Sequence, residues 1–467
     1  MVFNSFIFWL IFPVIFLVYW LIPIRYNNLK KLWLLVVSYL LYLNWKPAYV
    51  IVLLGVTLVT FGGGYFLNNK IDFNKRKRLL VWLLALIGLL PLLVFKYYNF
   101  INESVQYGLS YIGLQFTLPG LNWAIPVGIS FYTFQAVGYM LDVYHRRINA
   151  ERNLIDYMLF VSFFPQVLSG PISKGSELIP QLKQAQIFNY KKSVLGLQYL
   201  LWGMFLKLVV ADRLGIYVDT VYVNYHYYSG ATCFLASIFY SFQIYADFAG
   251  YSLMAVGIAK LFGYDIIKNF RQPYFSISIT DFWRRWHISL SRWLKDYVYI
   301  PLGGSRCSKI KCYSNILITF LVSGVWHGAN WTFVLWGFLH GLFQVIEKWM
   351  GFNKQGKTLL IIPRVIITFL IVNLLWILFR VDSLNQFVDL LHKFLNPSHG
   401  DVLNETVSFN LRNILIVLVV DLLCEIGILR KLLYRSVLIR WSIYIGLFTS
   451  ILLFGVLDSG QFIYVSF

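Results

Sequence analysis

Charged residues are scarce in this chain of 467 residues: Lys, Arg, Asp and Glu make up 13% of it, against 59% hydrophobic and 19% aromatic residues. A soluble globular domain carries about twice that share of charge, so a fold solvated by water alone is excluded. Apolar runs that can cross or enter a bilayer lie at 6–22, 32–45, 48–67, 79–95, 154–169, 194–210, 361–379, 411–424 and 441–456. We therefore expect an all-α polytopic membrane protein with about eleven transmembrane or re-entrant helices.

Cysteine is also scarce, and its four copies do not complete the paired spacing of a zinc site or a disulfide framework. The GxSxG nucleophile elbow, an evident Ser-His-Asp group and the Walker phosphate loop are also missing. We therefore expect no metal and no bound cofactor. The energy for a group transfer must then arrive in an activated co-substrate.

The charges that are present are mainly basic, with 40 Lys and Arg against 20 Asp and Glu. They lie between the apolar runs, which favours loops that set membrane topology over nucleic-acid binding. The basic groups after the first, third and fifth runs are Arg25 with Lys30 and Lys31, residues 75–78, and residues 145–147. The stretch 98–122, expected to be a loop, is poor in basic residues. By the positive-inside rule, both termini are expected outside the cytoplasm.

No linker and no internal repeat interrupts the chain, so residues 1–467 are expected to form one integral membrane domain. Within it, the segment 265–312 is too charged to cross lipid and is expected on the cytoplasmic side. A helix over 281–299 would present an aromatic face made by Trp286, Leu290, Trp293 and Tyr297. We expect this helix to be amphipathic and to lie at the membrane interface. Residues 458–467 are expected to form an extracytoplasmic tail.

The stretch LVSGVWHGANWTFVLWGF contains one ionisable side chain, His327. A histidine inside a bilayer is costly unless it faces protein or water, and a neutral imidazole there can act as a general base. Gly324 and Gly328 allow a backbone or a thioester to approach closely, and Trp326 and Trp331 are candidates for the wall of a tunnel. The alternative is a packed histidine that is hydrogen-bonded to a neighbouring helix.

Four motifs carry a family resemblance. They are SGPI at 169–172, YSFQIYADFAGYSLMAVGIAKLFGYDIIKNFRQPY at 240–274, DFWRRWHISLSRWLKDYVYIPLGGSR at 281–306 and WHGANWTFVLWGFLHG at 326–341. In this order they resemble the membrane-bound O-acyltransferase family, in particular its alginate O-acetylation branch. The resemblance implies a helical enzyme with a funnel on each side of a thin partition. It also implies that the family histidine, which by motif is His327, lies where the funnels meet and is catalytic.

The resemblance gives the second tryptophan-histidine motif a candidate role in binding the acyl donor. His287 is expected to position the donor or to assist the first histidine, or else to be an interfacial side chain that snorkels. The basic residues around it can bind the phosphates of coenzyme A or the headgroups of anionic lipids. They are Arg284, Arg285, Arg292 and Lys295.

Asp247 lies among apolar residues and, if buried, needs hydrogen-bond partners. Tyr245, Tyr251 or Ser252 is expected to supply them, so that Asp247 shapes the tunnel wall, orients a catalytic group or belongs to a structural polar network. His340 is expected to be a packing residue.

The C-terminal sequence GQFIYVSF places Tyr464 in an aromatic tail. The resemblance gives Tyr464 a possible role as an acyl carrier to a separate outer-surface transferase, because members of the branch often end in a Phe-x-Tyr-aromatic pattern. The tail matches that pattern at Phe462, Tyr464 and Phe467 but has Val465 and Ser466 between them. The alternative is an aromatic anchor at the membrane interface.

The resemblance implies a multi-pass enzyme of the bacterial inner membrane that takes acetyl from cytoplasmic acetyl-coenzyme A as co-substrate. The acceptor would be an alginate-like polysaccharide, peptidoglycan, or an extracytoplasmic acetyltransferase partner. Membrane lipids are further expected partners, and nucleic acid is not expected to bind. The alternatives are D-alanyl transfer to teichoic acid and a non-catalytic transporter of polysaccharide or acyl carrier, although the paired repeats typical of a transporter are missing.

Overall fold

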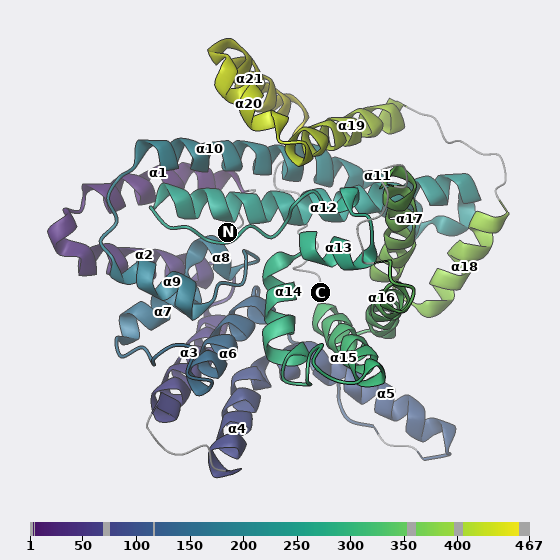
Figure 1. The fold of residues 1–467 in the computed structure, drawn as a ribbon, viewed down its shortest axis with the longest axis horizontal. Helices are drawn as coiled ribbons and strands as arrows, with labels where there is room; N and C mark the ends of the chain where they lie inside the picture. Colours follow the sequence, from purple (N-terminus) through teal and green to yellow (C-terminus); the bar gives the residue numbers. More distant parts are fainter. Residues whose placement is uncertain are drawn as a thin grey trace. The chain divides into compact units, whose positions relative to one another are not determined.

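The computed structural model has only helices as regular elements within the residues that it describes, which are 3, 5–68, 75–114, 117–352, 361–396 and 405–456 (Figure 1). A helix satisfies its backbone polar groups within one segment, which an apolar solvent such as lipid requires. Six of these helices are long and apolar enough to cross a membrane: Pro47–Asn68, Arg78–Tyr111, Tyr190–Val223, Ile361–Arg380, Thr406–Glu425 and Val437–Phe454. The predicted all-α polytopic membrane protein is thereby confirmed.

The expected number of about eleven crossing or re-entrant helices exceeds the number found, because the expectation included shorter and bent apolar runs. The pair Phe6–Leu21 and Ile24–Leu43 is bent by 107° and adds at most a seventh crossing within the described residues. Leu154–Val167 is apolar but shorter than a full crossing. The stretch 98–122, expected as a loop, contains helix α5 (Tyr98–Tyr111).

The chain forms two compact units. Residues 1–197 and 255–267 form the first unit, and residues 198–254 and 268–467 form the second. Two of the three boundaries fall inside α10 (Tyr190–Met204) and α12 (Gly230–Leu261), and the third lies between residues 267 and 268, after α12; no linker composition marks them in the sequence.

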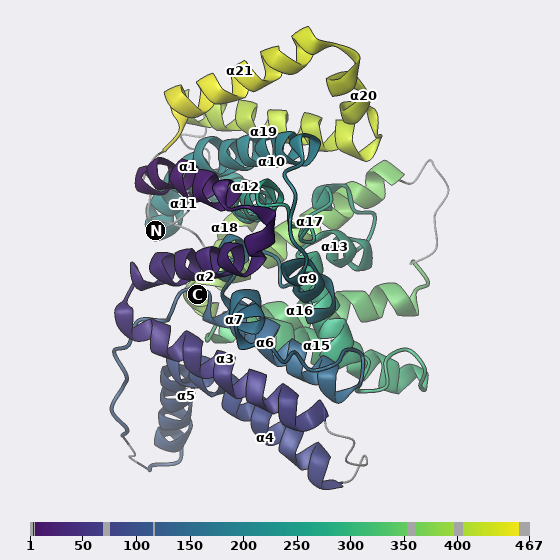
Figure 2. The same ribbon diagram turned by 90° about the vertical axis from the view of Figure 1, so that its left-hand side faces the viewer.

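The first unit is a helical assembly in which α3, α4 and α6 pack side by side (Figure 2). Its α-helices are α1 (Phe6–Leu21), α2 (Asn27–Leu43), α3 (Pro47–Asn68), α4 (Lys75–Leu92), α5 (Tyr98–Tyr111), α6 (Ile129–Tyr144), α7 (Leu154–Ser162), α8 (Phe164–Val167) and α9 (Gly175–Lys183). Gly63 of α3 permits a close approach, because a Cβ atom there would lie 2.8 Å from the sulfur of Met140 on α6.

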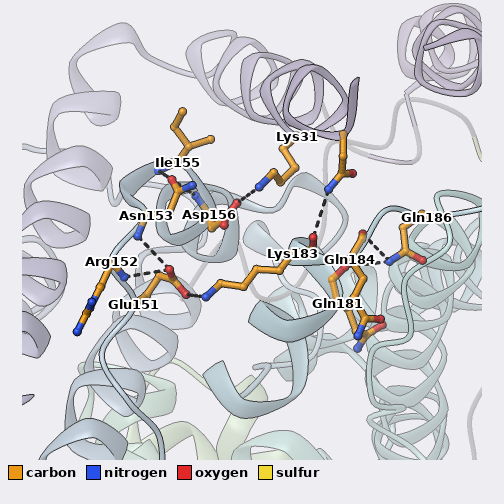
Figure 3. A network of polar contacts seen from close by, with 11 residues as sticks. Lys31, Glu151, Arg152, Asn153, Ile155, Asp156, Gln181, Lys183, Gln184 and Gln186 are labelled. Atoms are coloured by element: carbon orange, nitrogen blue, oxygen red, sulfur yellow. Dashed lines mark hydrogen bonds and ion pairs between the residues drawn. The ribbon is translucent and has the colours of Figure 1, made fainter. Parts of the chain in front are cut away.

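A polar network joins α2 to the segment around α7 and α9 in the first unit (Figure 3). Lys31 Nζ lies 2.6 Å from Asp156 Oδ1, and Lys183 Nζ lies 2.6 Å from Glu151 Oε2. The expectation that Lys30 and Lys31 belong to a charged loop is wrong: both are in α2, and they are 2% and 5% exposed. Lys31 can be buried because the carboxylate of Asp156 pairs with it.

The second unit holds the candidate site. Its elements are η3 (Phe205–Ala211), α11 (Asp212–Val223), η4 (Tyr225–Tyr227), α12, η5 (Pro273–Phe275), α13 (Ile279–Arg285), α14 (Ile288–Leu294), η6 (Lys295–Tyr299), α15 (Lys309–His327), α16 (Trp331–Trp349), α17 (Ile361–Arg380), α18 (Leu384–Leu395), α19 (Glu405–Glu425), α20 (Ile428–Arg435) and α21 (Val437–Phe454). Helices α15 and α16 pack along each other as a hairpin. The largest fully buried side chains of this unit are Trp286, Trp336 and Trp376.

The continuous amphipathic helix expected over 281–299 is absent, because the chain breaks between α13 and α14 at Trp286 and His287. The expected aromatic face does not lie open at an interface. Trp286 and Leu290 are fully buried, and Trp293 is 9% exposed. This face therefore packs into the protein core of the second unit.

Candidate active site

His327 is the last residue of α15 and is 1% exposed. Its imidazole lies in an aromatic enclosure, with ring centroids 4.9 Å from Trp326, 4.9 Å from Trp336 on α16 and 5.3 Å from Phe379 on α17. Asn330 caps the next helix by accepting the backbone N–H of Thr332 at 3.0 Å. Three consecutive helices therefore enclose this histidine.

The glycines around His327 serve helix packing. A Cβ atom on Gly324 would lie 3.1 Å from the Cα of Gly337 and closer still to the carbonyl oxygen of Phe333. A Cβ atom on Gly328 would overlap the ring of Phe333. The predicted close approach is thus one between α15 and α16, and it fixes the position of the histidine at the end of α15.

His287 lies beside His327, although the two are distant in sequence. Their ring centroids are 6.4 Å apart, and Trp326 lies 5.9 Å from the His287 ring. His287 is fully buried, so the expectation of a snorkelling interfacial side chain is wrong. Burial lowers the pKa of His287 to about 3, so its imidazole is neutral at physiological pH. A neutral imidazole beside a second buried histidine suits proton transfer and hydrogen bonding to a substrate.

Asn269, which the sequence analysis did not single out, holds the backbone at His287. His287 has a left-handed backbone with φ of 42°, which is unfavourable for a residue with a Cβ atom. The backbone oxygen of Asn269 accepts the N–H of Ile288 at 2.9 Å, and its Oδ1 accepts the N–H of Ser289 at 3.2 Å. Asn269 is 1% exposed. These two bonds stabilise the strained turn and the position of the imidazole.

A cavity of about 580 Å³ lies next to the two motifs. Its lining comes from α13, α14, η6, α15 and α16, and three of the four predicted basic residues belong to it: Arg284, Arg292 and Lys295. Lys348 of α16 adds a fourth cation that the sequence analysis missed, because it is far away in sequence. Trp283 lines the cavity, and its ring centroid lies 5.7 Å from that of Trp336, so the cavity borders the aromatic enclosure.

Arg285, the remaining member of the predicted basic cluster, is not among the residues that line the cavity. Its Nε lies 3.0 Å from Asp281 Oδ2, and its Nη1 lies 2.9 Å from Glu425 Oε1 of α19. Consecutive residues of a helix point about 100° apart, which separates Arg285 from Arg284. The prediction that Arg285 binds the donor is therefore corrected: its role is to join α13 to α19.

Lys348 is linked to a thiol at the edge of the cavity. Its Nζ lies 2.7 Å from the sulfur of Cys312, and the hydroxyl of Tyr299 lies 3.4 Å from the same sulfur. Burial raises the pKa of Cys312, but hydrogen bonds from Lys348 and Tyr299 outweigh it and hold the pKa below its ordinary value. The Cys312 sulfur therefore helps to hold the Lys348 side chain at the edge of the cavity.

Asp247 is buried on α12 and forms an ion pair. Its Oδ1 lies 2.7 Å from the Nζ of Lys207, which also lies 2.7 Å from Asp212. The expectation that Tyr245 would support it is wrong, because the Tyr245 hydroxyl donates to Asp421 at 2.8 Å. The neighbouring Phe248 contacts the His287 ring at 4.7 Å. Asp247 thus belongs to a buried charge network, and the next residue in the chain, Phe248, contacts the candidate site.

The remaining predicted residues differ in their settings. Trp331 is 56% exposed, so it does not form the expected wall, and Trp336 takes that place. His340 is fully buried and accepts a hydrogen bond at 3.2 Å from the indole N–H of Trp283, in keeping with a packing role. Tyr464 and the tail 458–467 lie outside the described residues.

Comparisons with known proteins point to one family. A sequence model of the membrane-bound O-acyltransferase family matches residues 146–379, which include both histidines and the cavity. The chain is 38% identical over 391 residues to a probable alginate O-acetylase AlgI of Pseudomonas syringae, covering 82% of this chain and 73% of that protein. It is 35% identical over 415 residues to a peptidoglycan O-acetyltransferase of Helicobacter pylori, covering 81% and 76%. A teichoic acid D-alanyltransferase of Bacillus subtilis is 27% identical over 290 residues, covering 59% and 70%.

Proposed function

The chain belongs to the membrane-bound O-acyltransferase family and is an O-acyltransferase, and from this premise we propose that it moves acetyl from acetyl-coenzyme A to hydroxyls of a cell-envelope or exported polysaccharide. The observation that carries the proposal is the cationic cavity beside two buried imidazoles. Guanidinium and ammonium groups bind phosphate oxygens, and coenzyme A is an anionic, phosphate-bearing thiol carrier.

The proposed chemistry is acyl transfer with His327 as general base. The acceptor hydroxyl attacks the thioester carbonyl while His327 takes its proton. Collapse of the tetrahedral intermediate breaks the carbon–sulfur bond and releases coenzyme A, whose thiolate takes the proton from His327 and so restores the neutral base. His287, with its ring centroid 6.4 Å from that of His327, lies close enough to assist by hydrogen bonding to a reacting group. The aromatic enclosure excludes water that would hydrolyse the thioester.

The proposed direction is outward across a bacterial inner membrane. Acetyl-coenzyme A is cytoplasmic, and the basic segment 265–312, which carries the cavity cations Arg284, Arg292 and Lys295, is assigned to the cytoplasmic side by the positive-inside rule. Both termini then lie outside. The acetyl group passes directly to the polysaccharide, or first to Tyr464 and then to an extracytoplasmic transferase.

The relatives support an acetyl group and a polysaccharide acceptor more than the alternatives. The two O-acetylating relatives described above are 38% and 35% identical over more than four-fifths of the chain. The D-alanyltransferases of Bacillus subtilis and Streptococcus thermophilus are 27% and 30% identical over 59% and 49% of it. A transporter without chemistry would not require two buried histidines beside a cavity lined by basic residues.

The proposal is tested by complementing a strain that lacks the gene. Wild type and the His392→Ala control, which alters an exposed histidine of α18, should restore O-acetyl signals in the purified polysaccharide, as measured by proton NMR. His327→Ala should restore none at equal membrane levels. Ester-linked D-alanine in place of acetate would favour the D-alanyl alternative, and an unmodified polymer in the wild-type strain would refute both transfers.

A further inference from the structure

Ser323 differs from the other hydroxyl residues that line the cavity of about 580 Å³, where the acyl donor is proposed to bind. It is 1% exposed, it lines the cavity, and its Oγ has no hydrogen-bond partner among the residues that the structure describes. A buried hydroxyl without a partner costs about 1–3 kcal/mol, so such groups are rare unless a ligand satisfies them.

The other aliphatic hydroxyls of the lining already have partners within the protein. Thr319 Oγ1 donates to the carbonyl oxygen of Asn315 at 2.6 Å, Thr280 Oγ1 donates to Glu347 at 3.0 Å, and Ser291 Oγ donates to the carbonyl oxygen of Trp286 at 3.4 Å. On α15 itself, Ser314 and Thr319 both bond to the carbonyl four residues earlier, the usual arrangement for such residues in helices. Ser323 departs from this arrangement.

The position of Ser323 indicates which part of a donor it would meet. It precedes His327 by four residues, which is about 6 Å or one turn along α15. Two cations of the lining, Arg284 and Lys295, are exposed. A donor whose phosphates contact these exposed cations would place its thioester deeper, towards Ser323 and the histidine.

We propose that the hydroxyl of Ser323 donates a hydrogen bond to the thioester carbonyl oxygen of the acyl donor. This inference rests on the proposed function, because it takes acetyl-coenzyme A as the donor. The carbonyl oxygen gains negative charge when the acceptor hydroxyl attacks, so the bond strengthens in the transition state. The proton stays on Ser323 throughout, and no bond to its oxygen forms or breaks.

The test compares kinetics of the purified protein with acetyl-coenzyme A. Ser323→Ala should lower kcat/KM for acetyl-coenzyme A by about 10- to 100-fold. Loss of one oxyanion-hole donor typically lowers kcat by about 100- to 1,000-fold, so the effect expected here is at or below the lower end of that range. Ser323→Thr, which keeps the hydroxyl, should recover most of this loss. Ser314→Ala, on the exposed side of the same helix, should match the wild type. The melting temperature should not fall in Ser323→Ala, because the lost hydroxyl bonds to no protein group in the described part of the chain.

Free coenzyme A provides a second measurement. It has no thioester carbonyl, so its inhibition constant should be the same in wild type and Ser323→Ala. A Ser323→Ala enzyme with wild-type kcat/KM, or a Ser323→Thr enzyme as impaired as Ser323→Ala, would overturn the role of the hydroxyl. A wild-type protein that does not use acetyl-coenzyme A would instead overturn the proposed donor, and the Ser323 proposal with it.

Discussion

The neighbouring arginines Arg284 and Arg285 should respond differently to substitution by alanine. Arg284→Ala should raise KM for acetyl-coenzyme A, whereas Arg285→Ala should lower the stability of the fold. Arg284 is exposed and lines the cavity, so Arg284→Ala removes a phosphate contact and leaves the fold intact. A charge-assisted hydrogen bond at a partly solvated site contributes about 1.4 kcal/mol, which is a tenfold rise in KM for acetyl-coenzyme A. This rise should shrink at high salt, because salt screens exposed charges.

Arg285→Ala should instead reduce stability. It leaves Asp281 and Glu425 without this cation, and their side chains are 21% and 32% exposed. Breaking a buried ion pair costs 3–5 kcal/mol, and partial solvation of the two carboxylates lowers that here to about 2 kcal/mol. KM for acetyl-coenzyme A should stay near the wild-type value in the protein that remains folded.

The assay measures thermal unfolding in detergent together with initial rates across acetyl-coenzyme A concentrations. Arg284→Lys and Arg285→Lys serve as matched controls that keep the charge. The reasoning is refuted if Arg285→Ala raises KM with no change in the melting temperature, or if Arg284→Ala unfolds the protein without affecting KM.

Three further predictions follow from the site. Gly324→Ala should destabilise the α15–α16 hairpin by about 1–3 kcal/mol, seen as a lower melting temperature, because its Cβ would clash with the Phe333 carbonyl oxygen; an unchanged melting temperature would contradict the packing argument. Asn269→Ala should lower kcat about tenfold with a smaller change in KM. Asn269→Asp keeps an acceptor for the Ser289 N–H and should be less impaired. Wild-type activity in both variants would refute a positioning role for Asn269. Tyr464→Phe keeps the aromatic ring and removes the hydroxyl, so polysaccharide acetylation should be lost if Tyr464 carries the acyl group; undiminished acetylation would favour direct transfer at the site.

The sequence was sufficient for the helical membrane fold and for the residues marked by long motifs. Apolar length and low charge predict membrane helices because lipid imposes that requirement on each segment independently. The motifs led to His327 and His287, and the structure places their rings 6.4 Å apart. The donor-binding prediction named Arg284 together with two other cations that line the cavity.

What the sequence did not reveal depends on contacts between distant segments. Arg285 is next to Arg284 in the chain, but its partner Glu425 lies on another helix. Lys348 joins the cavity from the far end of α16, and Trp336 replaces Trp331 beside the histidine. Local periodicity contains no information on such pairings, because the direction of a side chain depends on where the helices pack.

The most direct test of the account is acetyl transfer by the purified protein in lipid vesicles. Acetyl-coenzyme A labelled in the acetyl group is supplied with an acceptor polysaccharide, and the label in the polymer is measured for wild type, His327→Ala and the control His392→Ala. The account predicts transfer by the wild type and the control, and a rate about 100- to 10,000-fold lower for folded His327→Ala, the contribution expected of a general base. A folded His327→Ala protein that transfers acetyl at the wild-type rate would contradict the central claim.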